Sequence, residues 1–165
     1  MKSYPFRRKP GRRRLRPRIR SAALRRDLTQ IRQAFAHPDP EVRNAVVSAL
    51  RSDGEPALLR LILSQLIDDW RQTPDLRRRP LEDSLRALRP ASVEALKLEL
   101  LTTRKPASRI QLVELLAIVS PVDDALVVSL LADMQQRAYE HATVRAAAGR
   151  ALAKVQSPYP NPVES

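Results

Sequence analysis

Apolar residues recur along this chain at the spacing that is typical of amphipathic helices. The first such run has intervals of four, three and four residues between Leu24, Leu28, Ile31 and Phe35. This spacing places the apolar side chains on one side of an α-helix. Comparable runs predict helices over residues 22–36, 41–51, 55–69, 80–88, 91–102, 107–119, 122–137 and 141–155.

Prolines stand at the boundaries of these runs. Asp39 offers a capping acceptor directly before Pro40, and Pro56 follows the segment Asp53–Glu55 in the same way. The prolines that precede later runs of helix-forming residues are Pro80, Pro90, Pro106 and Pro121. Proline lacks an N–H group and disfavours helix in the residue before it, so it suits the first turn of a helix. The chain is therefore predicted to form eight short helices with tight connections.

Two of the predicted helices share one sequence frame. Val42–Leu50 and Val144–Leu152 both read V-R-x-A-x-x-x-A-L and lie 102 residues apart. More degenerate matches place Arg109 at an offset of 66 residues and Ala87 at an offset of 38 residues. Four copies over this distance give a period of about 34 residues, which is the length of one helical hairpin.

The frame D-P-E-V-R-x-A-x-x-x-A-L at Asp39–Leu50, followed by D-G-E-P-A-L-L at Asp53–Leu59, resembles the HEAT-repeat family. The resemblance is to its shorter bacterial form, often called the phycobilisome-lyase-like HEAT repeat, and extends over residues 22–155. It implies an all-α fold: a short right-handed α-solenoid of about four HEAT-like helical hairpins, each touching its neighbours. It also implies that Arg43 and Arg145 pair with an acid of a neighbouring repeat.

Composition agrees with an all-α chain that has one hydrophobic core. Apolar residues make up 43% of the sequence but aromatics only 4%, so Leu, Ala, Val and Ile must form the core of a domain of this size. The absence of cysteine excludes disulfides and thiolate chemistry. No apolar run is long enough to span a bilayer. We expect a cytoplasmic protein, with an organelle transit peptide at the basic N-terminus as the alternative.

The net charge of +12 is concentrated at the N-terminus. Residues 1–20 contain ten Lys or Arg and no acid, whereas the rest of the chain has 20 basic and 18 acidic residues. Like charges and prolines prevent such a segment from forming a core. The predicted organisation is a disordered Arg-rich arm over residues 1–20, a HEAT-like helical repeat domain over residues 21–156, and a Pro-rich tail over residues 157–165.

The arm is predicted to bind a polyanion, because guanidinium groups form bidentate contacts with phosphate. The candidate residues are Arg7, Arg8, Lys9, Arg12, Arg13, Arg14, Arg16, Arg18 and Arg20. Nucleic acid and an acidic protein surface are the favoured targets, an anionic membrane surface is less favoured, and a solubilising tail is the rival interpretation. Arg77, Arg78 and Arg79 form a candidate second basic patch, unless they are simply a solvated loop.

The sequence offers few residues for catalysis. His37 and His141 are the only histidines and stand beside predicted helix starts, so we expect turn or capping roles and neither a metal nor a cofactor. Asp68-Asp69-Trp70 invites comparison with HEAT-like DNA glycosylases. The favoured interpretation is that the two acids cap or face solvent at a helix end while Trp70 covers the edge of the core. Asp123 and Asp124 are expected in the first turn of a helix, where its dipole favours negative charge and a capping role explains them.

These observations predict a non-enzymatic adaptor or scaffold without a small-molecule substrate. Its solenoid binds a protein partner through a concave face formed by the second helix of each hairpin, and its arm provides electrostatic attachment. The candidate face comprises Arg43, Asn44, Ser48, Arg51, Arg86 and Glu114. One alternative is a nucleic-acid or ribonucleoprotein-binding protein with the arm as its main contact. Another is a pigment lyase or a chaperone-like HEAT protein, which the family resemblance suggests.

Overall fold

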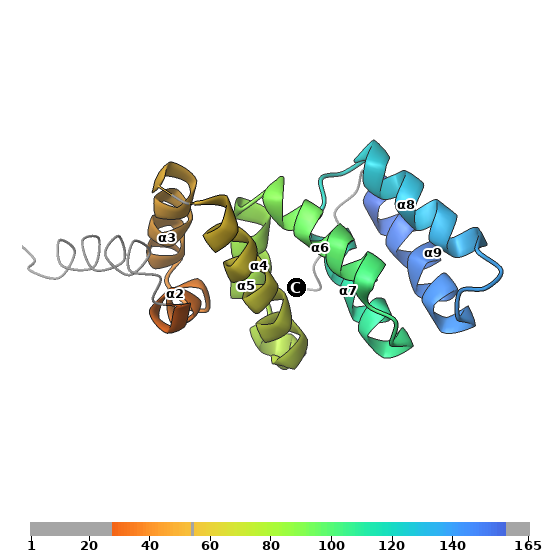
Figure 1. Cartoon of the computed structure of the whole chain (residues 1–165), viewed down its shortest axis with the longest axis horizontal. Coiled ribbons are helices and arrows are strands. Elements are labelled where there is room, and N and C mark those ends of the chain that lie inside the picture. The colour runs from red at the N-terminus through yellow and green to blue at the C-terminus, as the bar shows by residue number, and fades with distance from the viewer. Residues whose placement is uncertain (1–27, 54, 158–165) are drawn as a thin grey trace, which may run out of the picture.

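The computed structural model describes residues 28–53 and 55–157, and this part of the chain is helical without any strand (Figure 1). Its helices are α2 (Leu28–Phe35), α3 (Pro40–Asp53), α4 (Pro56–Gln72), the 3-10 helix η1 (Asp75–Arg77), α5 (Arg79–Ala87), α6 (Ala91–Thr102), α7 (Pro106–Val119), α8 (Ala125–Gln136) and α9 (Ala142–Gln156). The all-α prediction is confirmed. The predicted arm over residues 1–20 and residues 158–165 of the predicted tail lie outside the described residues.

Most helix boundaries fall within a few residues of the predicted ones, and α8 shows the clearest difference. A helix was expected from residue 122, but α8 begins at Ala125. Asp123 has a φ angle of 57°, which lies in the left-handed region and interrupts the helix. The Asp124 carboxylate then accepts hydrogen bonds from the backbone N–H groups of Leu126 and Val127 at 3.1 and 3.2 Å. Asp124 therefore caps α8, which confirms the predicted capping role for this acid, whereas the prediction that both acids lie within the first turn is wrong.

The prolines mark helix starts as predicted at most positions. Pro40, Pro56 and Pro106 are the first residues of α3, α4 and α7. Pro80 is the second residue of α5, and Pro90 directly precedes α6. Asp39 caps α3, because its Oδ1 atom accepts a hydrogen bond from the Glu41 N–H at 2.9 Å. Pro121 differs, since it lies in the connection before α8.

Replacing Asp39 with alanine tests this cap. We expect Asp39→Ala to lower the free energy of unfolding by about 1 kcal/mol, because the Glu41 N–H loses its acceptor. Asp39→Ser is the matched control, since its hydroxyl oxygen restores an acceptor at the same position. Urea unfolding followed by circular dichroism measures both variants. Equal stability of the alanine and serine variants would show that the cap does not stabilise α3.

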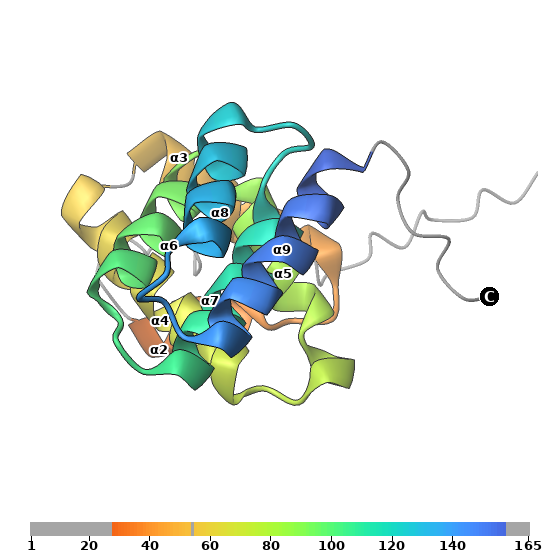
Figure 2. The same cartoon turned by 90° about the vertical axis from the view of Figure 1, so that its right-hand side faces the viewer.

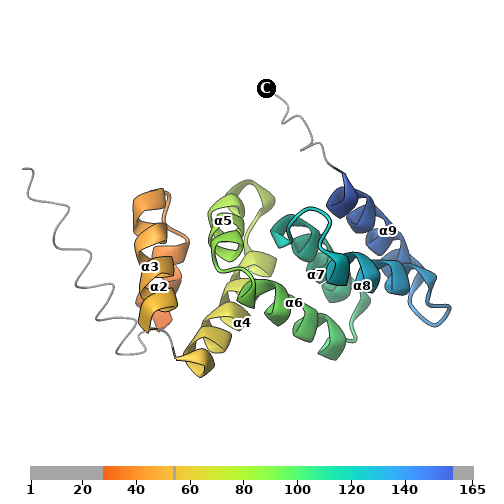
Figure 3. The same ribbon diagram turned by 90° about the horizontal axis from the view of Figure 1, so that it is seen from above.

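The helices pack as four hairpins arranged in sequence order. Within the hairpins, α2 packs on α3, α4 on α5, α6 on α7, and α8 on α9. Between hairpins, the second helices α3, α5, α7 and α9 contact one another in succession, and the first helices α2, α4 and α6 do the same. Figure 3 shows the hairpins side by side along the long axis, and Figure 2 shows them one behind another from the α8–α9 end. The structure thus has two rows of helices.

One hydrophobic core runs between the two rows. Trp70 is only 1% exposed, and the other buried side chains are almost all aliphatic. The helix α4 contacts α2, α5 and α6, which agrees with the apolar residues on nearly all its sides. Ala147, Ala148 and Ala151 are buried on α9, which packs against both α7 and α8. Small side chains there allow the helix backbones to approach closely.

None of the helices in the described segments combines the length and the apolar character needed to cross a bilayer.

Candidate functional site

The row of second helices carries all six residues of the predicted binding face. Asn44, Ser48 and Arg51 are exposed along one side of α3, at intervals of four and three residues. Glu114 is exposed on α7. Arg43 and Arg86 also lie in this row but are only partly exposed, because both contact neighbouring elements. The accessible part of this row is therefore polar and carries charges of both signs.

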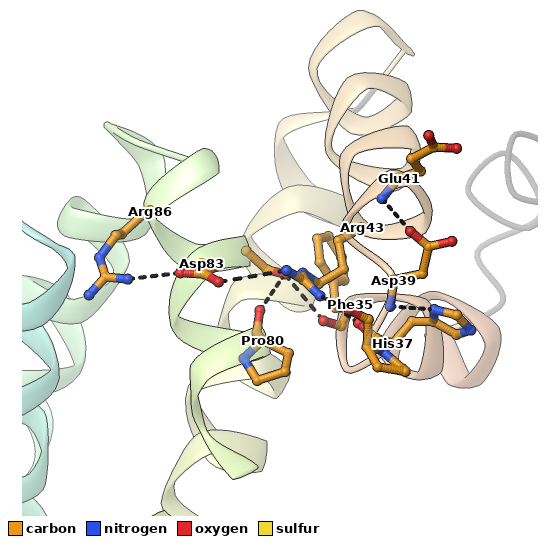
Figure 4. Close-up of polar contacts among 10 residues, drawn as sticks. Phe35, His37, Asp39, Glu41, Arg43, Pro80, Asp83 and Arg86 are labelled. Atoms are coloured by element: carbon orange, nitrogen blue, oxygen red, sulfur yellow. Dashed lines mark hydrogen bonds and ion pairs between the residues drawn. The ribbon is translucent and has the colours of Figure 1, made fainter. Parts of the chain in front are cut away.

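Arg43 connects the first hairpin to the second (Figure 4). Its Nη1 atom donates to the carbonyl oxygens of His37 and Pro38 at 2.7 and 2.9 Å. Its Nη2 atom lies 3.6 Å from Oδ2 of Asp83 on α5, and the other oxygen of that carboxylate lies 2.9 Å from Arg86 Nη1. The Arg43 side chain is only 12% exposed, so most of its surface is buried where the first two hairpins meet. The predicted pairing of Arg43 with an acid of the neighbouring hairpin is confirmed.

Arg109 makes the same set of contacts in the third hairpin. Its Nη1 atom donates to the carbonyl oxygens of Leu100 and Thr103 at 2.7 and 2.9 Å. Its Nη2 atom donates to the Glu140 carboxylate at 2.6 Å, and the two side chains are 14% and 10% exposed. Like Arg43 in α3, Arg109 is the fourth residue of its helix. At this position of the second helix, the arginine side chain therefore bonds to the turn of its own hairpin and to an acid of the next hairpin.

Arg145 occupies this position in α9, but within the described residues its side chain has no hydrogen bond or ion pair. No further hairpin packs on α9 in that part of the chain. The predicted pairing of Arg145 is therefore not observed there. The sequence frame identified all three arginines, but it gave no signal for the acids Asp83 and Glu140, which occupy different positions of their hairpins.

Two other arginines reach the carboxyl ends of neighbouring second helices. Arg51 Nη2 donates to the carbonyl of Arg89, just beyond α5, at 3.3 Å. Arg86 Nε donates to the carbonyl of Ile118, near the end of α7, at 3.0 Å. A guanidinium group is favoured there because the free carbonyls of a helix end carry partial negative charge. Burial lowers the pKa of Arg89, and the nearby positive charge of Arg86 lowers it further.

The two acids of Asp68-Asp69-Trp70 have different surroundings. Asp69 forms a bidentate pair with Arg32 of α2, in which Arg32 Nε lies 2.7 Å from Oδ2. This hydrogen-bonded carboxylate raises the pKa of Arg32. Asp68 lies 3.2 Å from Arg71 within the same helix. The prediction that these acids cap or face solvent at a helix end is confirmed only for Asp68, whose side chain is 47% exposed near the end of α4. Asp69 instead joins the first two hairpins.

Trp70 lies within the core and anchors the turn of the second hairpin. Its Nε1–H donates to the Glu82 carboxylate of α5 at 3.1 Å. The Arg78 guanidinium lies 4.2 Å from the centroid of the ring, and Arg78 Nε donates to the carbonyls of Trp70 and Thr73 at 3.1 and 2.8 Å. Arg78 therefore supports the turn, whereas Arg77 and Arg79 are exposed and their side chains have no polar partner among the described residues. The structure separates the members of this predicted basic patch.

Both histidines stand in turns, as predicted. His141 caps α9, since its ring nitrogen accepts from the Thr143 N–H at 3.3 Å. His37 accepts a hydrogen bond from the Asp39 N–H at 3.1 Å. Among the described residues, no group of three or more His, Cys, Asp or Glu side chains is arranged to hold a metal ion.

Comparison with known proteins gives no match: no family model, no curated protein and no solved structure matches the chain. The arguments about function therefore depend on the contacts described above and on the sequence.

Proposed function

We propose that this chain is a HEAT-like α-solenoid that acts as a non-enzymatic protein-interaction module. The observation that carries the proposal is the equivalence of Arg43 and Arg109, which make matching contacts at one position of two second helices. Repeated contacts between successive hairpins are typical of solenoids, in which each unit is stabilised by its neighbours. The packing of both helix rows in sequence order supports the same interpretation.

The row of second helices is the proposed protein-binding face. Asn44, Ser48 and Glu114 present exposed polar groups there, and Arg51 adds a positive charge. The ionic contacts beneath them hold neighbouring helices together, so the face is preorganised before a partner binds. Such a face needs neither a cofactor nor a small-molecule substrate.

The Arg-rich segment over residues 1–20 is the proposed second attachment, to a polyanion or an acidic surface. Its ten basic side chains have no acid among them to neutralise their charge. Two weak sites in one chain raise overall affinity, because binding at one increases the effective concentration at the other. The proposed location is the cytoplasm, and nothing in this function requires the disulfides that a cysteine-free chain cannot form.

Variants of the two attachments test the proposal separately. We expect Asn44→Glu with Ser48→Glu to abolish co-purification of the main protein partner from the native host. Ser129→Glu with Gln136→Glu, at exposed positions of α8, is the matched control and should retain it. Deletion of residues 1–20 should weaken capture in a salt-dependent way while shifting the melting temperature by less than about 3 °C.

Quantitative mass spectrometry with nuclease-treated samples measures the captured proteins. Equal capture by the α3 and α8 variants would remove the second-helix face from the proposal. Unfolding of the chain on deletion of residues 1–20 would contradict the division into an arm and a helical domain.

A further inference from the structure

The turns within the second, third and fourth hairpins lie on the same side of the molecule, which is the lower side in Figure 1. They comprise residues 73–78, 103–105 and 137–141. Figure 2 shows that the turn of the second hairpin lies toward the α5 side of this lower surface and the other two toward the α6 side. Because α4, α6 and α8 are each the first helix of a hairpin, the connections between hairpins lie at the opposite edge. We call the three turns and the helix residues beside them the hairpin-turn edge.

The hairpin-turn edge carries four cations whose side chains have no polar partner among the described residues. Arg77 ends η1, Arg79 is the first residue of α5, and Arg104 and Lys105 directly precede α7. All four are exposed, and none of their side chains has a hydrogen bond or ion pair within the described part of the chain.

The acids near these turns are already paired with other arginines. Asp75 contacts Arg78, while Asp133 pairs with Arg137. Glu140 is held by Arg109 in the contact described above. The connections between hairpins carry the carboxylates of Glu55, Asp123 and Asp124 and one cation, Arg89. The four cations of the hairpin-turn edge are therefore not neutralised by the acids beside them in the described part of the chain.

Each of the three turns also presents one large apolar side chain to solvent. Leu76 in η1 is 100% exposed, and Leu101 at the end of α6 is 66% exposed. Tyr139 in the fourth hairpin is 83% exposed, and the Arg137 guanidinium lies 5.9 Å from its ring centroid. Exposed apolar residues that recur beside unpaired cations indicate a surface for contact.

We propose that the hairpin-turn edge docks on the surface of an anionic lipid bilayer. Arg77, Arg79, Arg104 and Lys105 would contact the lipid headgroups, whose negative potential attracts basic side chains close to the membrane. Leu76, Leu101 and Tyr139 would enter the boundary between headgroups and acyl chains, where leucine and tyrosine side chains are favoured. This attachment is peripheral, and it does not depend on the protein-binding face proposed above.

The apolar side chains favour a bilayer over other polyanions. A single-stranded nucleic acid stacks its bases on aromatic rings, which would use Tyr139 but neither leucine. An acidic protein surface would neutralise the four cations and leave Leu76 fully exposed. A bilayer accounts for both sets of residues, because it offers negative charge at its surface and an apolar phase directly below.

Vesicle binding by the full chain tests the proposal, with residues 1–20 present in every substitution variant and absent only from a separate deletion variant. The probes are vesicles of phosphatidylcholine alone and vesicles of phosphatidylcholine with 30% phosphatidylserine. Each kind of vesicle is mixed with the protein and sedimented. We expect the unaltered chain to bind only the anionic vesicles. Leu76→Ser with Leu101→Ser should weaken this binding roughly tenfold or more, since two apolar insertions are lost.

Two sets of matched controls separate local contacts from general charge and hydrophobicity. Leu98→Ser with Leu126→Ser removes two leucines that are 61% and 67% exposed on α6 and α8, and should leave binding unchanged. Arg77→Ala, Arg104→Ala and Lys105→Ala together should weaken binding at least roughly tenfold. The control for this variant combines Arg60→Ala, Arg150→Ala and Lys154→Ala, which removes equal charge from exposed positions and should have less than a threefold effect.

Four results would overturn the proposal, of which the last concerns the deletion of residues 1–20. The first is absence of binding to anionic vesicles, and the second is an equal loss in the edge variants and their controls. The third is binding of a labelled 20-nucleotide single strand, but not of vesicles, with a lower affinity in the edge variants. That result would identify nucleic acid as the ligand. If deletion of residues 1–20 weakens binding while the edge variants do not, the arm alone provides the attachment and the inference fails.

Discussion

Replacing Arg109 with methionine is expected to lower the free energy of unfolding by about 3–5 kcal/mol. Arg109→Met removes the partner of the Glu140 carboxylate, which is only 10% exposed and would remain charged without compensation. It also removes the donor to the carbonyls of Leu100 and Thr103, which fastens the turn of the third hairpin. Urea unfolding followed by circular dichroism measures the loss.

A double-mutant cycle separates the ion pair from the other contacts of Arg109. Glu140→Gln alone should cost about 2 kcal/mol, because Arg109 keeps its two carbonyl acceptors. The coupling energy in Arg109→Met with Glu140→Gln should exceed about 1 kcal/mol, since the two side chains are in direct contact.

Arg145→Met is the matched control for this prediction. Arg145 occupies the same helix position but its side chain has no polar partner among the described residues, so its replacement should change stability by less than about 0.5 kcal/mol. Equal losses for Arg109→Met and Arg145→Met would contradict the role given to the contacts between hairpins.

Replacing Trp70 with alanine is expected to lower the free energy of unfolding by about 3–5 kcal/mol. The indole is 1% exposed and fills the core between α4 and α5, so Trp70→Ala leaves a large cavity. The variant also loses the hydrogen bond to Glu82 and the ring beneath Arg78. Circular dichroism is the suitable probe, because Trp70 is the single tryptophan of the chain and its fluorescence disappears with it.

Two further variants define what Trp70 contributes. Trp70→Phe keeps most of the buried ring but loses the N–H donor to Glu82, and should cost about 1–2 kcal/mol. Leu76→Ala changes a fully exposed side chain four residues beyond α4 and should cost less than about 0.5 kcal/mol. A loss in Trp70→Ala no larger than that in Leu76→Ala would show that Trp70 does not anchor the core.

Local sequence features predicted much of the helix arrangement. The start of α3 at Pro40 followed from the Asp39 cap and from the conformational restriction of proline, both of which act within one helical turn. The start of α8 was predicted too early, because the residues around Asp123 do not indicate its left-handed backbone conformation. Local rules therefore succeed where neighbouring residues decide the backbone conformation.

The candidate site was harder to predict, as the three consecutive arginines of the second hairpin show. Arg78 lies over Trp70 and bonds to two carbonyls, while Arg77 and Arg79 on either side are exposed. Identical residue types beside one another thus have different surroundings. The difference depends on the direction of each side chain in the turn and on the position of Trp70, neither of which is encoded in charge or periodicity.

The sequence by itself determined that the described chain is helical, where most helices begin, and that the chain's excess charge lies in residues 1–20. Only the tertiary structure decided which side chains meet, as in the pairs Arg32–Asp69 and Arg109–Glu140, whose partners are 37 and 31 residues apart. The physical reason is one of range. Helix periodicity and capping act over a few residues, whereas these pairs form only when the packing of successive hairpins brings distant segments together.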